Sequence, residues 1–243
     1  VSAFNHVITA IRIPRERAKG LHAVLEHPRL GMLLLFDPTS TTTPFGHLPP
    51  WLQASRGLLV TAEGGELIDL PAHDPAANEL RRTAKLQLDI AGTLKGSVEE
   101  IRTGSVAAQM RSELQALNAV ERVRFIDSTL AYHFANQTAA DVTIENLEEP
   151  EADLVVRYNV SAPHYAKGVA GMVLVRPRVV GSKGENAIAL AERKLGYVTD
   201  GPSLHTDEVE IAMPTELALD ELPKPLTLTT PHVQYASNST FEH

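Results

Sequence analysis

Two residues near the start of the sequence, His6 and Asp37, are of the types that transfer protons in enzymes. His6 lies in Phe4–Ile8, which is typical of a strand, and Asp37 ends the apolar run Met32–Phe36. A carboxylate that hydrogen-bonds one imidazole nitrogen fixes the tautomer of the ring, so that the other nitrogen can take a proton from a thiol or hydroxyl. The pattern therefore predicts a base and an orienting acid on neighbouring strands.

The sequence of 243 residues contains no cysteine, so it offers no thiol for this pair to activate. Other roles are open to both residues. His6 is also compatible with a buried histidine that donates to a backbone carbonyl. Asp37 precedes Pro38, and an aspartate in that position commonly caps the following turn through its carboxylate. One carboxylate can cap the turn and orient His6 together.

The residues around the pair resemble the closing half of the transglutaminase-like fold. Phe36–Ser40 reads Phe-Asp-Pro-Thr-Ser and follows a segment that carries a histidine. Thr43–Gln53 and Glu221–Pro225 are similar to segments of bacterial transglutaminase-like proteins with an appended β-rich domain of unknown function. The chain departs from that family at Val7–Ile8, where many members have Ala-Trp, and in the long connection Pro14–Leu30.

The resemblance implies a papain-type triad of cysteine, histidine and aspartate. His6 would be the base, Asp37 would orient it, and the cysteine would lie in an upstream part of the same protein, before Val1. The reaction implied is acyl transfer, or hydrolysis of an amide or peptide bond in a protein or peptide substrate. The resemblance also implies a periplasmic or cell-envelope location. The chain alone is then an inactive fragment.

A mainly β (α+β) protein of two domains is expected. Residues 1–72 would be the C-terminal part of a transglutaminase-like core. Residues 73–243 would form an antiparallel β-sandwich with an inserted helical hairpin, with helices near 105–117 and 119–135. The boundary is placed within Pro71–Pro75, because the apolar pattern lapses there.

Alternation of apolar residues predicts the first strands. Val1–Ile13 is largely apolar on both faces, which indicates an interior strand, and Met32–Phe36 indicates a short buried strand. Leu58–Val60 and Glu66–Leu70 are expected to pair through a turn at Gly64–Gly65.

Further along, residues 79–102 alternate as a long antiparallel hairpin. Ser105–Ala135 has helical spacing with a change of phase at Asn118, which is expected to cap a second helix while Glu121 reaches back to it. Later strands are expected around Val142–Ile144, Leu154–Val160, Val173–Val175, Val209–Met213, Leu217–Leu219 and Leu226–Leu228.

Two other groups of residues invite functional interpretations. Trp51 is the only tryptophan and follows two prolines, so it is expected to anchor the edge of the core; a wall of a substrate cleft is the alternative. His22 and His27 flank Glu26, but this spacing fits no zinc signature, and a solvated loop is expected. No metal or cofactor site is predicted.

Composition narrows the class of protein. Hydrophobic residues make up 43% of the chain and charged residues 21%, which is typical of a globular protein with a packed core. The formal charge of -8 and the absence of a basic patch argue against nucleic acid as a partner. No apolar run approaches the ~20 residues needed to span a bilayer. The alternative to the enzyme is a non-catalytic β-sandwich module that binds a protein or glycan in the cell envelope.

Overall fold

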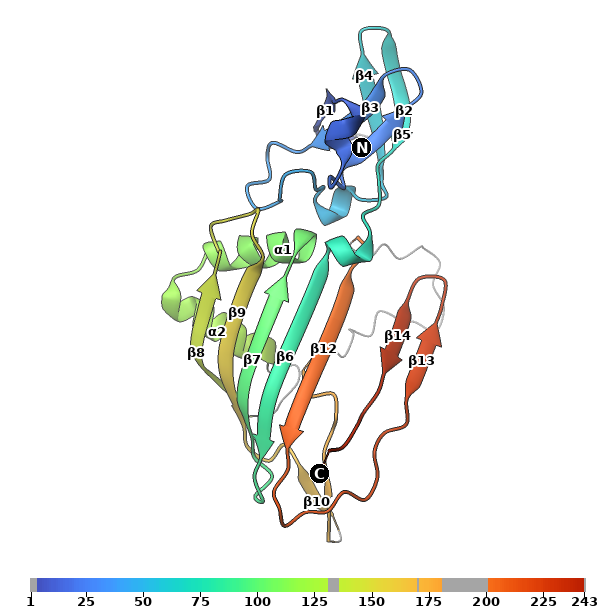
Figure 1. The fold of residues 1–243 in the computed structure, drawn as a ribbon. Coiled ribbons are helices and arrows are strands. Elements are labelled where there is room, and N and C mark those ends of the chain that lie inside the picture. Colours follow the sequence, from blue (N-terminus) through green and yellow to red (C-terminus); the bar gives the residue numbers. More distant parts are fainter. Residues whose placement is uncertain (1–3, 131–135, 170, 181–200, 243) are drawn as a thin grey trace.

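The structure is a computed structural model that describes residues 4–130, 136–169, 171–180 and 201–242. The protein is mainly β, with several antiparallel sheets and two α-helices among the described residues, which confirms the expected class. Figure 1 shows a small N-terminal group of strands at one end of a larger sheet, and the helices on one face of that sheet.

The N-terminal group holds a three-stranded antiparallel sheet in the order β1-β3-β2. These strands are β1 (Thr9–Arg12), β2 (Val24–His27) and β3 (Gly31–Phe36). A separate antiparallel hairpin follows, formed by β4 (Arg56–Thr61) and β5 (Gly64–Asp69). Short 3-10 helices lie at Arg15–Ala18, Pro50–Leu52 and Pro75–Ala77.

The larger sheet has five strands in the order β12-β6-β7-β9-β8 (Figure 1). The adjacent pairs β6–β7, β7–β9 and β9–β8 are antiparallel. The edge strand β12 runs parallel to β6. The expected hairpin over 79–102 is confirmed as β6 and β7. The strand bounds are β6 Glu79–Leu88, β7 Leu94–Arg102, β8 Thr138–Glu145, β9 Leu154–Ala162 and β12 Leu204–Ala212.

Two helices, α1 (Gly104–Gln115) and α2 (Ala119–Leu130), connect β7 to β8. The expected capping box is confirmed. Asn118 Oδ1 accepts from the backbone N–H of Glu121 at 3.1 Å, and Glu121 Oε2 accepts from that of Asn118 at 2.9 Å. Residues 131–135, expected to continue the second helix, lie outside the described residues.

Two small hairpins complete the described elements. β10 (Lys167–Val169) pairs with β11 (Met172–Leu174), and β13 (Leu226–Thr229) pairs with β14 (Gln234–Ser237). The strand expected at 217–219 does not form. The segment after β12 contains three prolines, which have no N–H to donate to a neighbouring strand.

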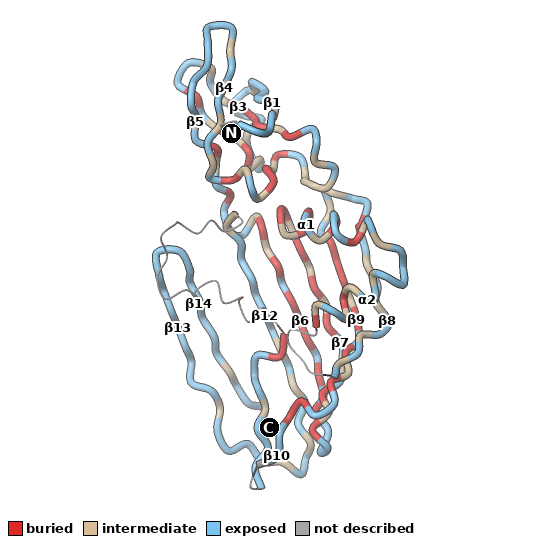
Figure 2. Tube along the Cα trace, turned by 180° about the vertical axis from the view of Figure 1, so that it is seen from behind, coloured by how far each residue is buried: buried red, intermediate tan, exposed pale blue. Residues whose placement is uncertain are grey.

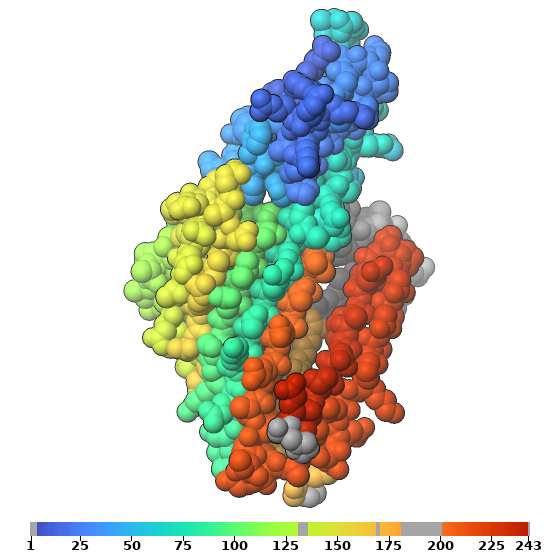
Figure 3. Space-filling model, viewed as in Figure 1, coloured from blue at the N-terminus to red at the C-terminus, as the bar shows by residue number. Residues whose placement is uncertain are grey.

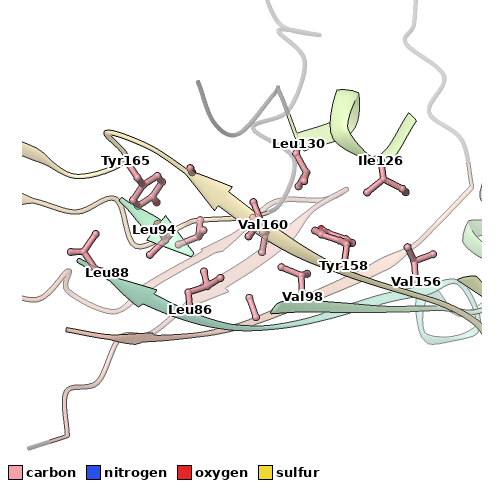
Figure 4. Close-up of a cluster of buried hydrophobic side chains, with 14 of the residues drawn as sticks. Leu86, Leu88, Leu94, Val98, Ile126, Leu130, Val156, Tyr158, Val160 and Tyr165 are labelled. Carbon is pink, nitrogen blue, oxygen red and sulfur yellow. The ribbon is translucent and has the colours of Figure 1, made fainter. Parts of the chain in front are cut away.

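Alternation along β6, β7 and β9 places one face of each strand inside the protein and the other in solvent (Figure 2). The inward residues form one large apolar cluster with the helices, and Figure 4 shows Ile126 and Leu130 packed over Val98, Tyr158 and Val160. A second, smaller cluster lies in the N-terminal group. The domain division at residues 72 and 73 stays a prediction.

Two expectations about the N-terminal strands are wrong. The strand expected over Val1–Ile13 is limited to β1, and residues 4–8 form no strand. β1 is an exposed edge strand and not an interior one. Residues 1–3 lie outside the described part. The reason is that Phe36, the last residue of β3, pairs with Thr9, so the residues before Thr9 have no strand to pair with.

The turn expected at Gly64–Gly65 is also wrong. In the hairpin of β4 and β5, Thr61 pairs with Gly64, so the turn residues are Ala62 and Glu63.

Candidate functional site

The structure brings His6 and Asp37 into direct contact. His6 Nε2 lies 2.9 Å from Asp37 Oδ2, in a hydrogen bond that joins residues 31 apart in sequence. The pairing of Thr9 with Phe36 explains the contact, because it sets the segment before β1 beside the end of β3. The His6 side chain is 30% exposed, whereas that of Asp37 is 1% exposed. The pair therefore opens to solvent on the histidine side only.

Thr39 holds the carboxylate of Asp37 from its other side. Asp37 Oδ1 accepts a hydrogen bond from the Thr39 backbone N–H at 3.0 Å and from Thr39 Oγ1 at 2.7 Å. The aspartate thus caps the turn and binds His6 at once, through different oxygens. The role of Asp37 was predicted from the sequence and that of Thr39 was not, although a hydroxyl residue two positions after Asp is a recognisable signal of such a turn.

These contacts determine the charge and tautomer of the pair. Burial raises the pKa of Asp37, but the hydrogen bonds from Thr39 and His6 outweigh it, so that the pKa lies below its usual value. The carboxylate then accepts from an N–H on His6 Nε2, which leaves the lone pair on Nδ1. The ring makes no other hydrogen bond with described residues. Nδ1 is therefore the nitrogen that is free to act as a base.

Trp51 lies beside the histidine and not against the core. Its ring meets the His6 ring edge to face, with centroids 5.8 Å apart, and 57% of the residue is exposed. The expectation of a core anchor is wrong, because its neighbour Leu52 packs against the small apolar cluster instead. Trp51 forms an aromatic surface next to the exposed side of the pair, and the alternative of a cleft wall stays a prediction.

A cluster of three imidazoles was not foreseen from the sequence. The rings of His22, His47 and His73 lie with centroids 4.6 to 5.6 Å apart. The Nδ1 atoms of His47 and His73 are buried without a hydrogen-bond partner. Burial and the neighbouring histidines lower the pKa of both residues to about 4, against a weaker opposing effect of Glu151 on His47. The rings of His47 and His73 are therefore neutral at pH 7.

The tautomer of His73 argues against a metal ion in this cluster. The Leu48 N–H donates to His73 Nε2 at 3.3 Å, so the proton of the neutral ring is on Nδ1, which then cannot be a ligand. Within the described residues, no three His, Asp or Glu side chains are arranged to hold a metal ion. The three rings come from residues far apart in the sequence, which is why spacing gave no signal.

The expectation of a solvated loop around His22, Glu26 and His27 is wrong. Glu26 and His27 lie in β2, and His27 is 4% exposed. His27 Nδ1 accepts from the backbone N–H groups of Arg29 and Leu30, both at 3.2 Å. His27 therefore closes the turn between β2 and β3.

The outer face of the large sheet carries a second candidate site. A shallow groove of about 350 Å³ crosses β6, β7 and β9 on the face that the helices do not cover. Figure 3 shows these strands side by side on the viewed surface. Its charged or polar lining side chains are those of Thr83, Lys85, Ser97, Glu99, Asp141, Arg157 and Asn159.

Comparisons with models of protein families, with curated proteins and with solved structures give no match. In the described part of the chain, no helix is long and apolar enough to cross a membrane. Proposals about the family, location and residue roles of this chain therefore rest on the sequence resemblance and on the contacts described above.

Proposed function

We propose that the chain is the C-terminal part of a transglutaminase-like protein, in which His6 is the general base and Asp37 orients it. The thiol would come from a cysteine in a segment outside these 243 residues. The resemblance supports a periplasmic or cell-envelope protein that acts on a protein or peptide substrate.

The observation that carries the proposal is the hydrogen bond between His6 Nε2 and the buried Asp37 Oδ2. It leaves Nδ1 with a lone pair on an imidazole that is partly exposed, as a base must be to reach a reactant. A carboxylate that is ionised at neutral pH also stabilises the imidazolium that forms when the base takes a proton.

The chemistry follows from this arrangement. His6 Nδ1 takes the thiol proton, and the thiolate attacks an amide carbonyl of the substrate. As the C–N bond breaks, the leaving amine takes the proton back from His6, and a thioester remains. An amine or a water then attacks the thioester, with His6 again as the base. The C–S bond breaks, and the released thiolate takes the proton back from His6, which completes acyl transfer or hydrolysis.

The test is His6→Ala in the protein that also carries the cysteine. Loss of general-base catalysis is expected to lower turnover of an amide substrate by at least about 100-fold. His232→Ala is a matched control, because His232 is exposed in the turn between β13 and β14 and makes no contact with the site. Unchanged turnover in His6→Ala contradicts the proposal.

The groove on the outer face supports a second candidate function for the same chain, namely binding of a glycan or peptide without catalysis. Its polar lining includes a cation, Lys85, and an amide, Asn159, whose side chain donates to Asp141 at 2.8 Å. Such groups suit a hydroxyl-rich or peptide ligand and not an apolar one.

This binding function is tested by titrating soluble oligosaccharides and peptides into the isotope-labelled chain and following its NMR signals. Binding is expected to shift residues of the groove and to weaken in Lys85→Ala. Lys95→Ala is the control, since Lys95 is exposed on the adjacent strand but does not line the groove. Shifts confined to other surfaces, or equal effects of both variants, contradict this role.

A further inference from the structure

Strand β12 ends the five-stranded sheet on one side, and among the described strands it pairs with β6 alone (Figure 1). All nine of its residues are exposed or half-buried (Figure 2). On the neighbouring strand β6, by contrast, every second residue from Leu80 to Leu88 is buried. In the described part of the chain, β12 therefore presents an open edge.

The backbone of β12 has hydrogen-bonding groups on that open edge. The Leu204 N–H donates to the Asn78 carbonyl, next to β6, at 3.1 Å. Successive residues of a strand direct their N–H and C=O groups to opposite sides, so those of residues 206, 208, 210 and 212 also face β6. The groups of residues 205, 207, 209 and 211 then face the open edge, where no described backbone group bonds to them. Such a row of unpaired groups is a template onto which another strand can add.

The inner face of β12 is apolar in its second half. Val209 and Ile211 are half-buried and pack against the large apolar cluster. Nearer the start of the strand this face is charged, since Asp207 is paired with Arg82, and Arg178 adds a positive charge. A strand added beside the second half would cover the exposed parts of Val209 and Ile211 if it carried apolar side chains on the same face.

The outer face of β12 is acidic in the same half. Glu208 and Glu210 are exposed, and neither side chain bonds to a described residue. Lys85 of β6 is the register partner of Glu210 but forms no ion pair with it. On the opposite edge strand β8, by contrast, Glu145 is paired with Arg157. Even when Lys85 is counted, the two glutamates leave the outer face of β12 negatively charged.

We propose that the second half of β12 binds an extended basic segment of a partner protein, which adds to the sheet as a further strand. The residues of this segment beside Glu208 and Glu210 are lysine or arginine, and those beside Val209 and Ile211 are valine, isoleucine or leucine. Opposite charges on adjacent strands stabilise a sheet, and main-chain hydrogen bonds give the affinity in this mode of recognition. The formal charge of -8 on the chain also attracts a basic partner.

A second copy of the chain fits this edge less well. Two β12 strands side by side place glutamates beside glutamates on the outer face, and like charges on adjacent strands destabilise a sheet. The other edge strand, β8, carries Asp141 and Glu145, and a register shift between Ala140 and Thr143 interrupts it. The charges therefore favour a basic partner over self-association.

Titration of the full chain into the fluorescently labelled peptide Lys-Val-Lys-Ile-Lys-Val-Lys tests this edge by anisotropy. We expect saturable one-to-one binding, and binding at least about tenfold weaker when glutamate replaces every lysine. Glu208→Gln combined with Glu210→Gln should weaken binding of the lysine peptide about fivefold. Glu16→Gln combined with Glu63→Gln is the matched control. It removes the same charge from exposed positions in the N-terminal group and should leave binding nearly unchanged.

Two further measurements use the unsubstituted chain and so do not depend on the folding of a variant. The lysine peptide with every amide N-methylated keeps its charges and side chains but cannot donate as a strand, so it should not bind. Hydrogen exchange followed by NMR should show new protection of the Val209 and Ile211 N–H groups when the unmethylated peptide is bound.

Absence of saturable binding by the lysine peptide means that the glutamates serve only to keep the edge unpaired, and this overturns the proposal. Equal binding by the methylated peptide or by the glutamate peptide overturns it as well. So does new protection confined to β8, or dimerisation of the chain alone with protection of Val209 and Ile211.

Discussion

The N-terminal region and the five-stranded sheet region stabilise their interiors by different means. The sheet region has a large apolar cluster to which three strands and both helices contribute. The N-terminal region has a much smaller one, centred on Leu34, Leu35 and Leu48. Beside that small cluster it packs three imidazoles, of which His73 is 3% exposed.

This difference has a consequence for how each region responds to its surroundings. Burial of apolar area is insensitive to pH, whereas a buried neutral histidine opposes its own protonation. The N-terminal region should therefore lose stability in acid, and the sheet region should be most sensitive to a change of side-chain volume. Trp51, the only tryptophan, reports on the first region by fluorescence, and circular dichroism of the β structure reports mainly on the second.

The largest expected effect is acid destabilisation of the N-terminal region. His47 and His73 have pKa values of about 4 in the folded protein and 6.5 when unfolded. Because the unfolded chain takes up protons first, the free energy of unfolding is constant above pH 6.5 and falls as the pH drops from 6.5 to 4. The expected loss is about 3 kcal/mol for each histidine. Urea unfolding followed by Trp51 fluorescence between pH 4 and pH 8 measures it.

His73→Gln should remove part of this pH dependence, because an amide can still accept from the Leu48 N–H but does not titrate. His205 is the histidine of the sheet region with a lowered pKa, but it lies on the exposed edge strand β12. Equal acid sensitivity of the fluorescence and the circular dichroism transitions would contradict the contrast between the two regions.

The next effect concerns side-chain volume. Leu154→Ala removes a fully buried side chain from the large cluster, and Leu48→Ala does the same in the small one. We expect Leu154→Ala to lower the free energy of unfolding of the sheet region by about 2 to 5 kcal/mol. Leu48→Ala should act mainly on the fluorescence transition. Leu226→Ala is the control, since Leu226 is 54% exposed and should cost less than about 0.5 kcal/mol.

The sequence predicts the sheet region better than the N-terminal region, for physical reasons. Strict alternation in β6 and β7 and the Asn118 capping box are local signals, and the structure confirms both. The parallel pairing of β12 with β6 joins segments more than 100 residues apart, and no local pattern encodes it.

At the site, the pairing of His6 with Asp37 is predictable from the sequence, but the segment that holds His6 is not the strand that its residues predict. The contact forms because the neighbouring residues Thr9 and Phe36 are in register, so a strand at His6 itself is unnecessary. The three-histidine cluster depends on contacts between residues far apart in the chain, so it has no fixed spacing in the sequence.

The smallest expected effect is that of Thr39→Val. This substitution tests whether a polar contact in the N-terminal region controls the ionisation of Asp37. Thr39→Val removes the Oγ1 hydrogen bond to Asp37, so the pKa of Asp37 should rise towards its usual value. A lowered carboxyl pKa stabilises the folded state at neutral pH and ceases to do so as the pH falls through that pKa. The variant should therefore cost about 1 kcal/mol at pH 7 and less in strong acid.

The carboxyl carbon of Asp37, followed by NMR during a pH titration, measures this pKa directly. Thr61→Val is a matched control, because Thr61 Oγ1 bonds only within the hairpin of β4 and β5. If the Asp37 pKa is the same in Thr39→Val as in the control, the Thr39 hydroxyl does not help to keep the carboxylate ionised. The hydrogen bonds from His6 and from the Thr39 backbone N–H would then account for the lowered pKa, and the hydroxyl contact would be structural only.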